Sequence, residues 1–176
     1  MVSKTPKRFE PANPFARTLA ALRRWPDARQ WLQAAPVLAA TAAIVLAIAM
    51  VGGFAHWAPR PFGADWLTIA AIVFVLPALV EEVVFRGLLM PVPGIASMRI
   101  GMWLSIALFV IWHPLQAIVF GPPWSALLLA PAFLAAVLVL AIGLTHVRIV
   151  TGSLWPAILG HWAIVAAWKL LFAGPF

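Results

Sequence analysis

The sequence predicts an all-α fold, a polytopic membrane helix bundle with about five transmembrane spans behind a basic N-terminal segment. Composition is the first observation that supports it: of the 176 residues, 64% are apolar and only 10% are charged. A soluble domain of this length keeps much of its surface in water and could not cover that much apolar surface. The second observation is a series of long stretches without Asp, Glu, Lys or Arg, the pattern expected of helices that cross a bilayer.

The first element is a basic segment, residues 1–33, which we expect to precede a transmembrane domain at 34–176. It holds seven of the twelve basic residues: Lys4, Lys7, Arg8, Arg17, Arg23, Arg24 and Arg29. Such a cluster beside an apolar stretch indicates an orientation signal and contact with anionic lipid headgroups, and it argues against nucleic acid as the partner. Phe15, Leu19 and Leu22 share one helical face, which fits a short helix in the membrane interface. An unstructured basic tail is the alternative.

Five apolar stretches follow, each near the length of about 20 residues that a spanning helix needs. They cover residues 36–55, 66–90, 100–119, 125–146 and 154–172. Gly121-Pro122-Pro123 interrupts the longest uncharged stretch and predicts a turn between the third and fourth spans. The chain contains no cysteine, which excludes disulfides and thiolate sites.

Basic residues also predict the orientation of the bundle. Arg86, Arg99 and Arg148 mark connections on the same side as the N-terminus, so the positive-inside rule puts the N-terminus in the cytoplasm of a multi-pass cell-membrane protein. Lys169 lies near the far end of the last span, where its side chain can snorkel outward. The small size favours a bacterial inner membrane, and nothing in the sequence indicates an oligomeric state.

Glu81 and Glu82 lie inside the second apolar stretch, where a charged side chain costs about 2.5–3.5 kcal/mol and is typical of a functional site. Arg86 follows Glu82 by four residues, the spacing that favours an ion pair on a helix. Glu81 points about 100° away and lacks that partner. We therefore expect Glu82 and Arg86 to support the helix and Glu81 to react. The alternative is a network of all three that only anchors the helix.

Two histidines extend this pattern. His113 lies in the third span, one turn after Phe109, and His161 lies in the fifth. At 1.5 Å per residue, Glu81, His113 and His161 lie roughly 14, 20 and 10 Å from the cytoplasmic ends of their spans. These depths predict one buried site that opens toward the cytoplasm.

A carboxylate with two histidines permits two kinds of hydrolysis. In one, Glu81 takes a proton from water with the help of His113, and His161 stabilises the oxyanion. In the other, Glu81, His113 and His161 bind zinc, because two histidines and a glutamate form a known catalytic zinc set. The His-Glu-x-x-His motif common at such sites is missing, so we expect no cofactor and keep zinc as the alternative.

The Glu-Glu-x-x-x-Arg motif at 81–86, Phe-x-x-x-His at 109–113 and the late His161 resemble the CPBP (Abi) family, which includes the type II CAAX prenyl endopeptidases and bacteriocin self-immunity proteins. The resemblance runs from about Asp65 to Trp168. It implies a glutamic-type intramembrane endopeptidase acting on a peptide or membrane-protein substrate near the cytoplasmic side. Glu81 is then the base and His113 its partner in activating water.

The resemblance also implies that His161 faces the oxyanion, and that Glu82 and Arg86 complete the first motif. One position departs from the family, because many members have Asn four residues after the last histidine and this chain has Val165. Gln116, one turn after His113, is the candidate substitute donor. The alternative function is a non-catalytic membrane protein that confers bacteriocin self-immunity or binds a partner.

Overall fold

The computed structural model describes residues 13–90, 98–121 and 123–175, and its regular elements are helices, as predicted. The α-helices are α1 (Pro14–Arg23), α2 (Ala28–Val51), α3 (Ala64–Val73), α4 (Val80–Glu82), α5 (Met98–Phe120), α6 (Pro131–Thr151) and α7 (Trp155–Leu171). The π-helical turns η1 (Phe74–Leu79) and η2 (Val83–Leu88) join α3 and α4 into one segment, and the 3-10 helix η3 (Pro123–Leu129) precedes α6. Lys4, Lys7, Arg8 and Pro122 lie outside the described residues.

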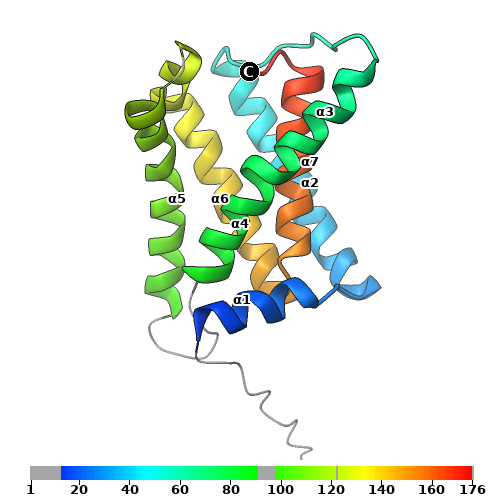
Figure 1. The fold of residues 1–176 in the computed structure, drawn as a ribbon, viewed down its shortest axis with the longest axis vertical. Coiled ribbons are helices and arrows are strands. Elements are labelled where there is room, and N and C mark those ends of the chain that lie inside the picture. The colour runs from blue at the N-terminus through cyan, green and yellow to red at the C-terminus, as the bar shows by residue number, and fades with distance from the viewer. Residues whose placement is uncertain (1–12, 91–97, 122, 176) are drawn as a thin grey trace, which may run out of the picture.

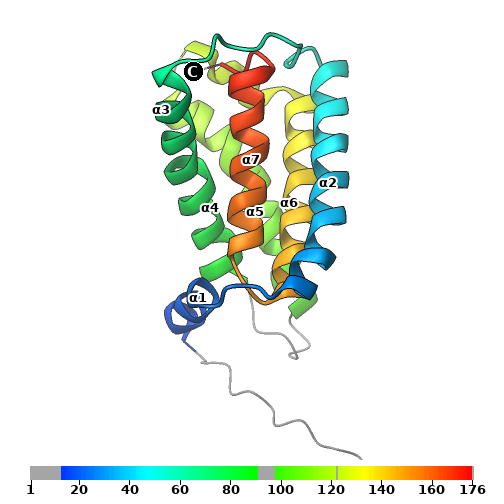
Figure 2. The ribbon, with the colours of Figure 1, turned by 90° about the vertical axis from the view of Figure 1, so that its right-hand side faces the viewer.

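Four helical segments of the described chain are long and apolar enough to cross a membrane: Ala28–Val51, Ala64–Leu88, Arg99–Phe120 and Pro131–Thr151. α7 has 17 residues, the lower limit of a spanning helix. It lies between α3 and η1 on one side and α6 and α2 on the other, so it runs through the bundle beside these segments (Figures 1 and 2). This bundle agrees with the prediction of about five spans.

α2 begins at Ala28, well before the predicted start at residue 36. The reason is a capping box: Asp27 Oδ1 accepts the Gln30 N–H at 2.8 Å, and Gln30 Oε1 accepts the Asp27 N–H at 3.1 Å. These polar residues therefore start the helix in water before its apolar part begins. The predicted boundary between residues 33 and 34 falls within α2, and the division into two parts stays a prediction.

The fourth span was predicted at 125–146, but α6 occupies Pro131–Thr151 and η3 takes the residues before it. Pro131 stands at the start of α6, where its missing N–H is no loss. Gly152 ends the helix in the left-handed conformation, with φ 65°. Arg148 lies within α6, and its Nε donates to the Arg86 carbonyl at 3.3 Å.

The segment that carries the two glutamates is kinked at Pro77. Leu76, directly before the proline, has non-helical φ −128° and ψ 112°. Helical geometry resumes before Glu81, within α4. The break gives the outer and inner parts of this segment different directions (Figure 1).

The predicted interfacial segment is helical: α1 lies across one end of the bundle (Figure 1). Its buried face packs on η2, where an added Cβ at Gly87 would meet Thr18 Cγ2 at 2.6 Å. Trp155 Nε1 donates to the Leu22 carbonyl at 2.8 Å. Phe15, one turn before Thr18, is 72% exposed. α1 thus joins the end of η2 to the start of α7.

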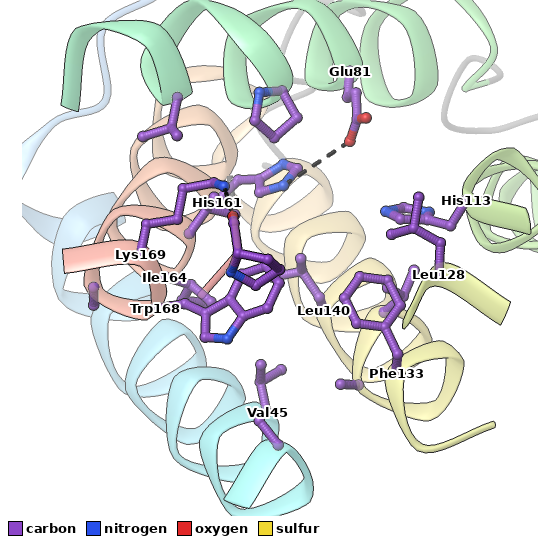
Figure 3. Close-up of a pocket in the computed structure, with 18 of the residues that line it drawn as sticks. Val45, Glu81, His113, Leu128, Phe133, Leu140, His161, Ile164, Trp168 and Lys169 are labelled. Atoms are coloured by element: carbon purple, nitrogen blue, oxygen red, sulfur yellow. Dashed lines mark hydrogen bonds and ion pairs between the residues drawn. The ribbon is translucent and has the colours of Figure 1, made fainter. Parts of the chain in front are cut away.

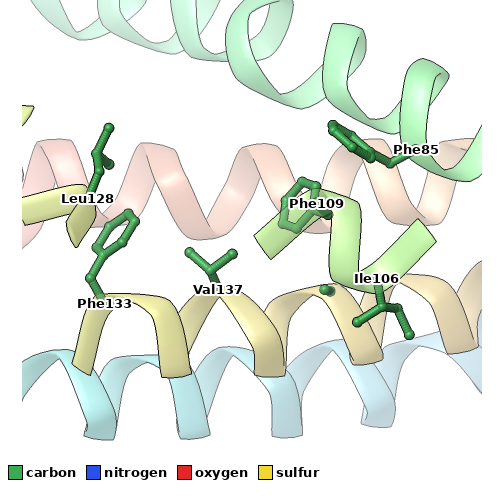
Figure 4. Packing of buried hydrophobic residues seen from close by; sticks show 7 residues of the cluster. Phe85, Ile106, Phe109, Leu128, Phe133 and Val137 are labelled. Carbon is green, nitrogen blue, oxygen red and sulfur yellow. The ribbon is translucent and has the colours of Figure 1, made fainter. Parts of the chain in front are cut away.

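The largest buried cluster links α5, α6, η2 and η3 (Figure 4) and consists of Phe85, Ile106, Phe109, Leu128, Phe133, Val137 and Ala141. Phe109 and Ala141 are fully buried in it. The Phe85 ring meets the Phe109 ring edge-on, with centroids 5.1 Å apart. This packing fixes the helix faces that carry the polar residues described below.

The close approach of α2 and α6 depends on Gly143, where a Cβ would overlap the Thr41 Oγ1. We predict that Gly143→Val destabilises the bundle by about 1–3 kcal/mol, because the added side chain overpacks this contact. Unfolding in detergent micelles measures the effect. Gly63→Val is the matched control, since a Cβ there meets no described atom within 4 Å. Equal loss of stability in both variants would contradict the prediction.

Candidate active site

Arg86, Glu82 and His161 form a buried charged cluster. Arg86 Nη1 donates to Glu82 Oε1 at 3.0 Å, which confirms the ion pair expected from their spacing. The same oxygen lies 2.9 Å from His161 Nδ1, and because a carboxylate oxygen accepts, this nitrogen donates its hydrogen. All three side chains are almost completely buried, with exposures of 1%, 0% and 2%. The sequence had assigned His161 to Glu81 alone.

Arg86 also contacts two further helices. Its Nη2 donates to the Ala141 carbonyl of α6 at 3.3 Å, and its Cζ lies 4.1 Å from the centroid of the Phe109 ring of α5. The second contact is a cation–π interaction, which is stronger away from water. Arg86 therefore holds four segments together: η2, α5, α6 and, through Glu82, α7.

Glu81 has a different environment on the neighbouring helix face. Its Oε1 accepts from Trp112 Nε1 at 3.0 Å and from Gln116 Nε2 at 3.4 Å. Its Oε2 is buried, has no hydrogen-bond partner among the described residues and lies 4.0 Å from His161 Nε2. One oxygen of this carboxylate is thus fixed by two donors, and the other points at a histidine beyond hydrogen-bond distance.

Sequence reasoning missed Trp112 as a partner of Glu81. Its spacing contained the signal: Trp112 and Gln116 are one turn apart on α5 and share a face, as Phe109 and His113 do. Tryptophans in membrane proteins usually anchor helices at the membrane boundary, and this general tendency obscures a tryptophan that donates inside the bundle. Trp112 directly precedes His113, which was placed deep in the span, and this position indicates a polar donor inside the bundle.

His113 lies on the same side of α5 but has its own hydrogen bond. Its Nδ1 lies 2.9 Å from the Phe109 carbonyl, which can only accept, so Nδ1 carries the hydrogen and Nε2 of the neutral ring is an acceptor. The Phe109 ring packs edge-on against both histidines, with centroids 5.1 Å from His113 and 6.0 Å from His161. No described hydrogen bond or ion pair joins His113 to Glu81.

The three predicted reactive residues nevertheless line one cavity of about 670 Å³ (Figure 3). Glu81, His113 and His161 point into it from three helices, and apolar side chains form most of the remaining wall. Val165, one turn after His161, is part of that wall. A cavity of this size can hold a short peptide, and an apolar wall strengthens the polar interactions inside it.

The direction of the cavity differs from the expectation. Its lining comes from the C-terminal halves of α2, α5 and α7 and from the N-terminal half of α6, the end of the bundle away from α1 (Figure 1). The sequence predicted an opening toward the end that carries the basic segment. Lys169, which was expected to snorkel outward, lines the far part of the cavity.

The arrangement of the histidines bears on the zinc alternative. Among the described residues, no group of three or more His, Cys, Asp or Glu side chains is arranged to hold a metal ion. His161 donates from Nδ1 to Glu82, and His113 donates from Nδ1 to a carbonyl. Zinc at Glu81, His113 and His161, the alternative that the sequence left open, therefore stays a prediction.

Comparison with known protein families bears on the identity of this fold. A family model described as "Rce1-like: Type II CAAX prenyl endopeptidase Rce1-like" matches residues 63–167, more than half of the chain. The matched range includes Glu81, Glu82, Arg86, Trp112, His113, Gln116 and His161. It begins after α2 and ends before Lys169. No curated protein and no solved structure matches the chain.

Substitutions can test how much the ion pair of Arg86 and Glu82 contributes to the stability of the protein. Arg86→Met leaves the Glu82 carboxylate without its cation, so we predict a loss of about 3–5 kcal/mol in the free energy of unfolding. The double variant Glu82→Gln/Arg86→Met removes both charges and should recover most of that loss. Unfolding in mixed micelles measures both. A double variant no more stable than Arg86→Met would show that the ion pair does not account for the effect.

Proposed function

The chain belongs to the Rce1-like family of type II CAAX prenyl endopeptidases, and on this basis we propose an intramembrane endopeptidase in which Glu81 activates water to hydrolyse a peptide bond. The observation that carries the proposal is the state of the Glu81 carboxylate. Two donors hold Oε1, while the buried Oε2 has no hydrogen-bond partner among the described residues and borders the cavity. A general base needs such an oriented oxygen within reach of its water.

Trp112 and Gln116 act as positioning residues in this mechanism. Their hydrogen bonds to Oε1 fix the plane of the carboxylate, so that Oε2 faces the cavity. Glu81 takes the proton of the attacking water through Oε2 and returns it to the leaving amine. Gln116 thereby serves the base, and its amide is less suited to the oxyanion role that the sequence suggested for it.

His161 supplies the oxyanion donor. Its Nδ1 donates to Glu82, which fixes the ring so that Nε2 faces Glu81 Oε2 at 4.0 Å. When His161 is protonated, Nε2–H donates to the developing oxyanion, and the charges of Glu81, Glu82, Arg86 and His161 sum to zero. Oxyanion donors of this kind contribute about 10²–10³ in rate. The need for a neutral cluster in an apolar interior supports this assignment.

His113 accepts the second hydrogen of the water. Its Nε2 is the free acceptor, because Nδ1–H is used by the Phe109 carbonyl. Phe109 packs against the rings of both His113 and His161, so one aromatic side chain sets the orientation of both. The water is then held between an acceptor on α5 and the base on α4.

The second candidate is a non-catalytic CPBP-like membrane protein that confers bacteriocin self-immunity or binds a partner. Val165 favours it, because this apolar side chain lines the cavity where many family members have an amide donor. The same cavity would then bind a peptide without cleaving it. A self-immunity phenotype that persists in both Glu81→Gln and His113→Ala would support this candidate.

We further propose that the protein lies in a bacterial inner membrane with its N-terminus in the cytoplasm and acts on a peptide or a membrane-protein segment. The exposed Arg23, Arg24 and Arg29 around α1 support that orientation, since such residues favour the cytoplasmic side. The cavity then extends from Glu81 toward the outer face.

We predict that Glu81→Gln lowers the rate of peptide cleavage at least 10²-fold, because the amide cannot take a proton while it keeps the volume of the acid. Comparison of membrane peptides from cells with the wild type and the variant identifies substrates and measures the loss. Asp65→Asn, which removes an exposed carboxylate at the start of α3, is the control and should cleave normally. Cleavage that survives Glu81→Gln would exclude Glu81 as the base.

The metal question has its own measurement. We predict that cleavage by the purified protein withstands prolonged treatment with a strong chelator, because Glu81 and the histidines already activate water in the proposed mechanism. Metal analysis of the active preparation should then find less than one zinc per chain. Loss of cleavage on chelation and its return with zinc would replace this mechanism by a zinc-dependent one.

A further inference from the structure

Helices α2 and α6 form an open groove of about 550 Å³ that is separate from the cavity of the candidate active site. The two helices lie side by side (Figure 2). No described residue lines both the groove and the cavity. On α6, Ala141 accepts from Arg86, and at about 100° per residue it points away from Val139 and Gly143 of the groove wall. The groove therefore faces the outside of the bundle.

The wall of this groove is apolar over most of its length. The Thr41 hydroxyl donates to the Val37 carbonyl at 2.8 Å, so it is satisfied within α2. From Pro36 to Ile44 the wall covers eight residues of one helix, about 12 Å at 1.5 Å per residue. One leaflet of a bilayer has a hydrocarbon depth of about 15 Å, half of the full core. The groove thus has the length of one acyl chain within one leaflet.

The end of the groove nearer α1 is basic. His146 lines this end and is exposed, and a neutral imidazole keeps one N–H donor in either tautomer. Arg29 lies seven residues before Pro36, or two turns, so it shares the groove face of α2, and it is exposed. The Gln30 amide donates to the Thr151 carbonyl at 3.1 Å, which places Arg29 just beyond His146 along the axis of the groove.

An apolar wall with a basic end fits an anionic phospholipid. Among the described residues, no acidic side chain lines the groove. Asp27, the acid nearest to Arg29 along the chain, accepts the Gln30 N–H at the start of α2. A second copy of the chain fits less well, because packing groove to groove in one membrane orientation would bring the two basic ends together.

We propose that the groove between α2 and α6 binds one anionic phospholipid from the leaflet beside α1. Its acyl chain lies along the apolar wall, and its phosphate lies between Arg29 and His146. This lipid site exists whether or not the protein cleaves peptides. It involves α2, which precedes the range that the family model matches.

Native mass spectrometry of the purified full chain in a mild detergent tests the proposal. The protein is titrated with palmitoyl-oleoyl phosphatidylglycerol and with phosphatidylcholine that has the same acyl chains. We expect the first phosphatidylglycerol to bind at least about fivefold more tightly, the factor that one basic residue near an anionic headgroup contributes. Equal affinity for the two lipids overturns the proposal.

Two variants test the two ends of the site. Arg29→Gln should remove the preference for phosphatidylglycerol and leave the affinity for phosphatidylcholine unchanged. Ala40→Phe fills the groove and should lower the affinity for both lipids at least about fivefold, since the acyl chain loses its apolar contact.

Each variant has a matched control. Arg23→Gln removes another exposed arginine at the same end of the bundle and should keep the preference. Ala39→Phe adds the same ring at an exposed neighbour outside the groove lining and should bind lipid as the wild type does. Arg29→Gln changes only an exposed side chain, so it decides the outcome even if Ala40→Phe does not fold.

Three further results would reject the lipid site. The first is a loss of preference in Arg23→Gln as large as in Arg29→Gln, which would indicate general attraction to the basic end. The second is phosphatidylglycerol binding that is as tight in Ala40→Phe as in Ala39→Phe. The third is a dimer without bound lipid that Ala40→Phe dissociates, which would assign the groove to a second copy of the chain.

Discussion

The burial of one guanidinium constrains much of this structure. Arg86 is 1% exposed in a bundle whose other side chains are mostly apolar. A charge in such a place is tolerated only when it is paired and hydrogen-bonded. Glu82 supplies the counter-charge, the Ala141 carbonyl a further acceptor and the Phe109 ring a polarisable face. Because these partners come from α4, α5 and α6, and Glu82 in turn binds His161 of α7, the pairing of Arg86 sets the relative positions of four helices.

That requirement separates the two neighbouring glutamates. One oxygen of Glu82 accepts hydrogen bonds from both Arg86 and His161, and moving this side chain would leave a buried charge unpaired. Glu81 is one residue earlier, faces another side of the helix and meets neutral donors from α5 instead. Neutral donors orient a carboxylate without cancelling its charge, so Glu81 is suited to proton transfer and Glu82 to support. His161 hydrogen-bonds to Glu82 and lies 4.0 Å from Glu81, which couples the supporting pair to the reactive carboxylate.

The sequence predicted those features that depend on one helix alone. Periodicity and charge gaps identified the apolar helices, and the four-residue spacing identified the pair of Glu82 and Arg86. It did not predict features that depend on how helices meet. The donor Trp112, the bond between His161 and Glu82 and the direction of the cavity arise from helix rotation and tilt, which no spacing within one helix encodes. The early start of α2 was missed because a capping box there overrides the apolar pattern.

Helix α1 also positions the site, although it lies outside the range that the family model matches. The match to the Rce1-like family begins at residue 63, yet α1 contacts both matched segments that carry the buried cluster. Thr18 packs on Gly87 at the end of η2, and the Ala21 carbonyl accepts the Leu154 N–H before α7 at 3.3 Å. Glu82 precedes Gly87 by a little over one turn, and His161 follows Leu154 by about two. A shift of α1 would therefore move both sides of the hydrogen bond that fixes His161, so the geometry of the site depends on a helix that the family match does not include.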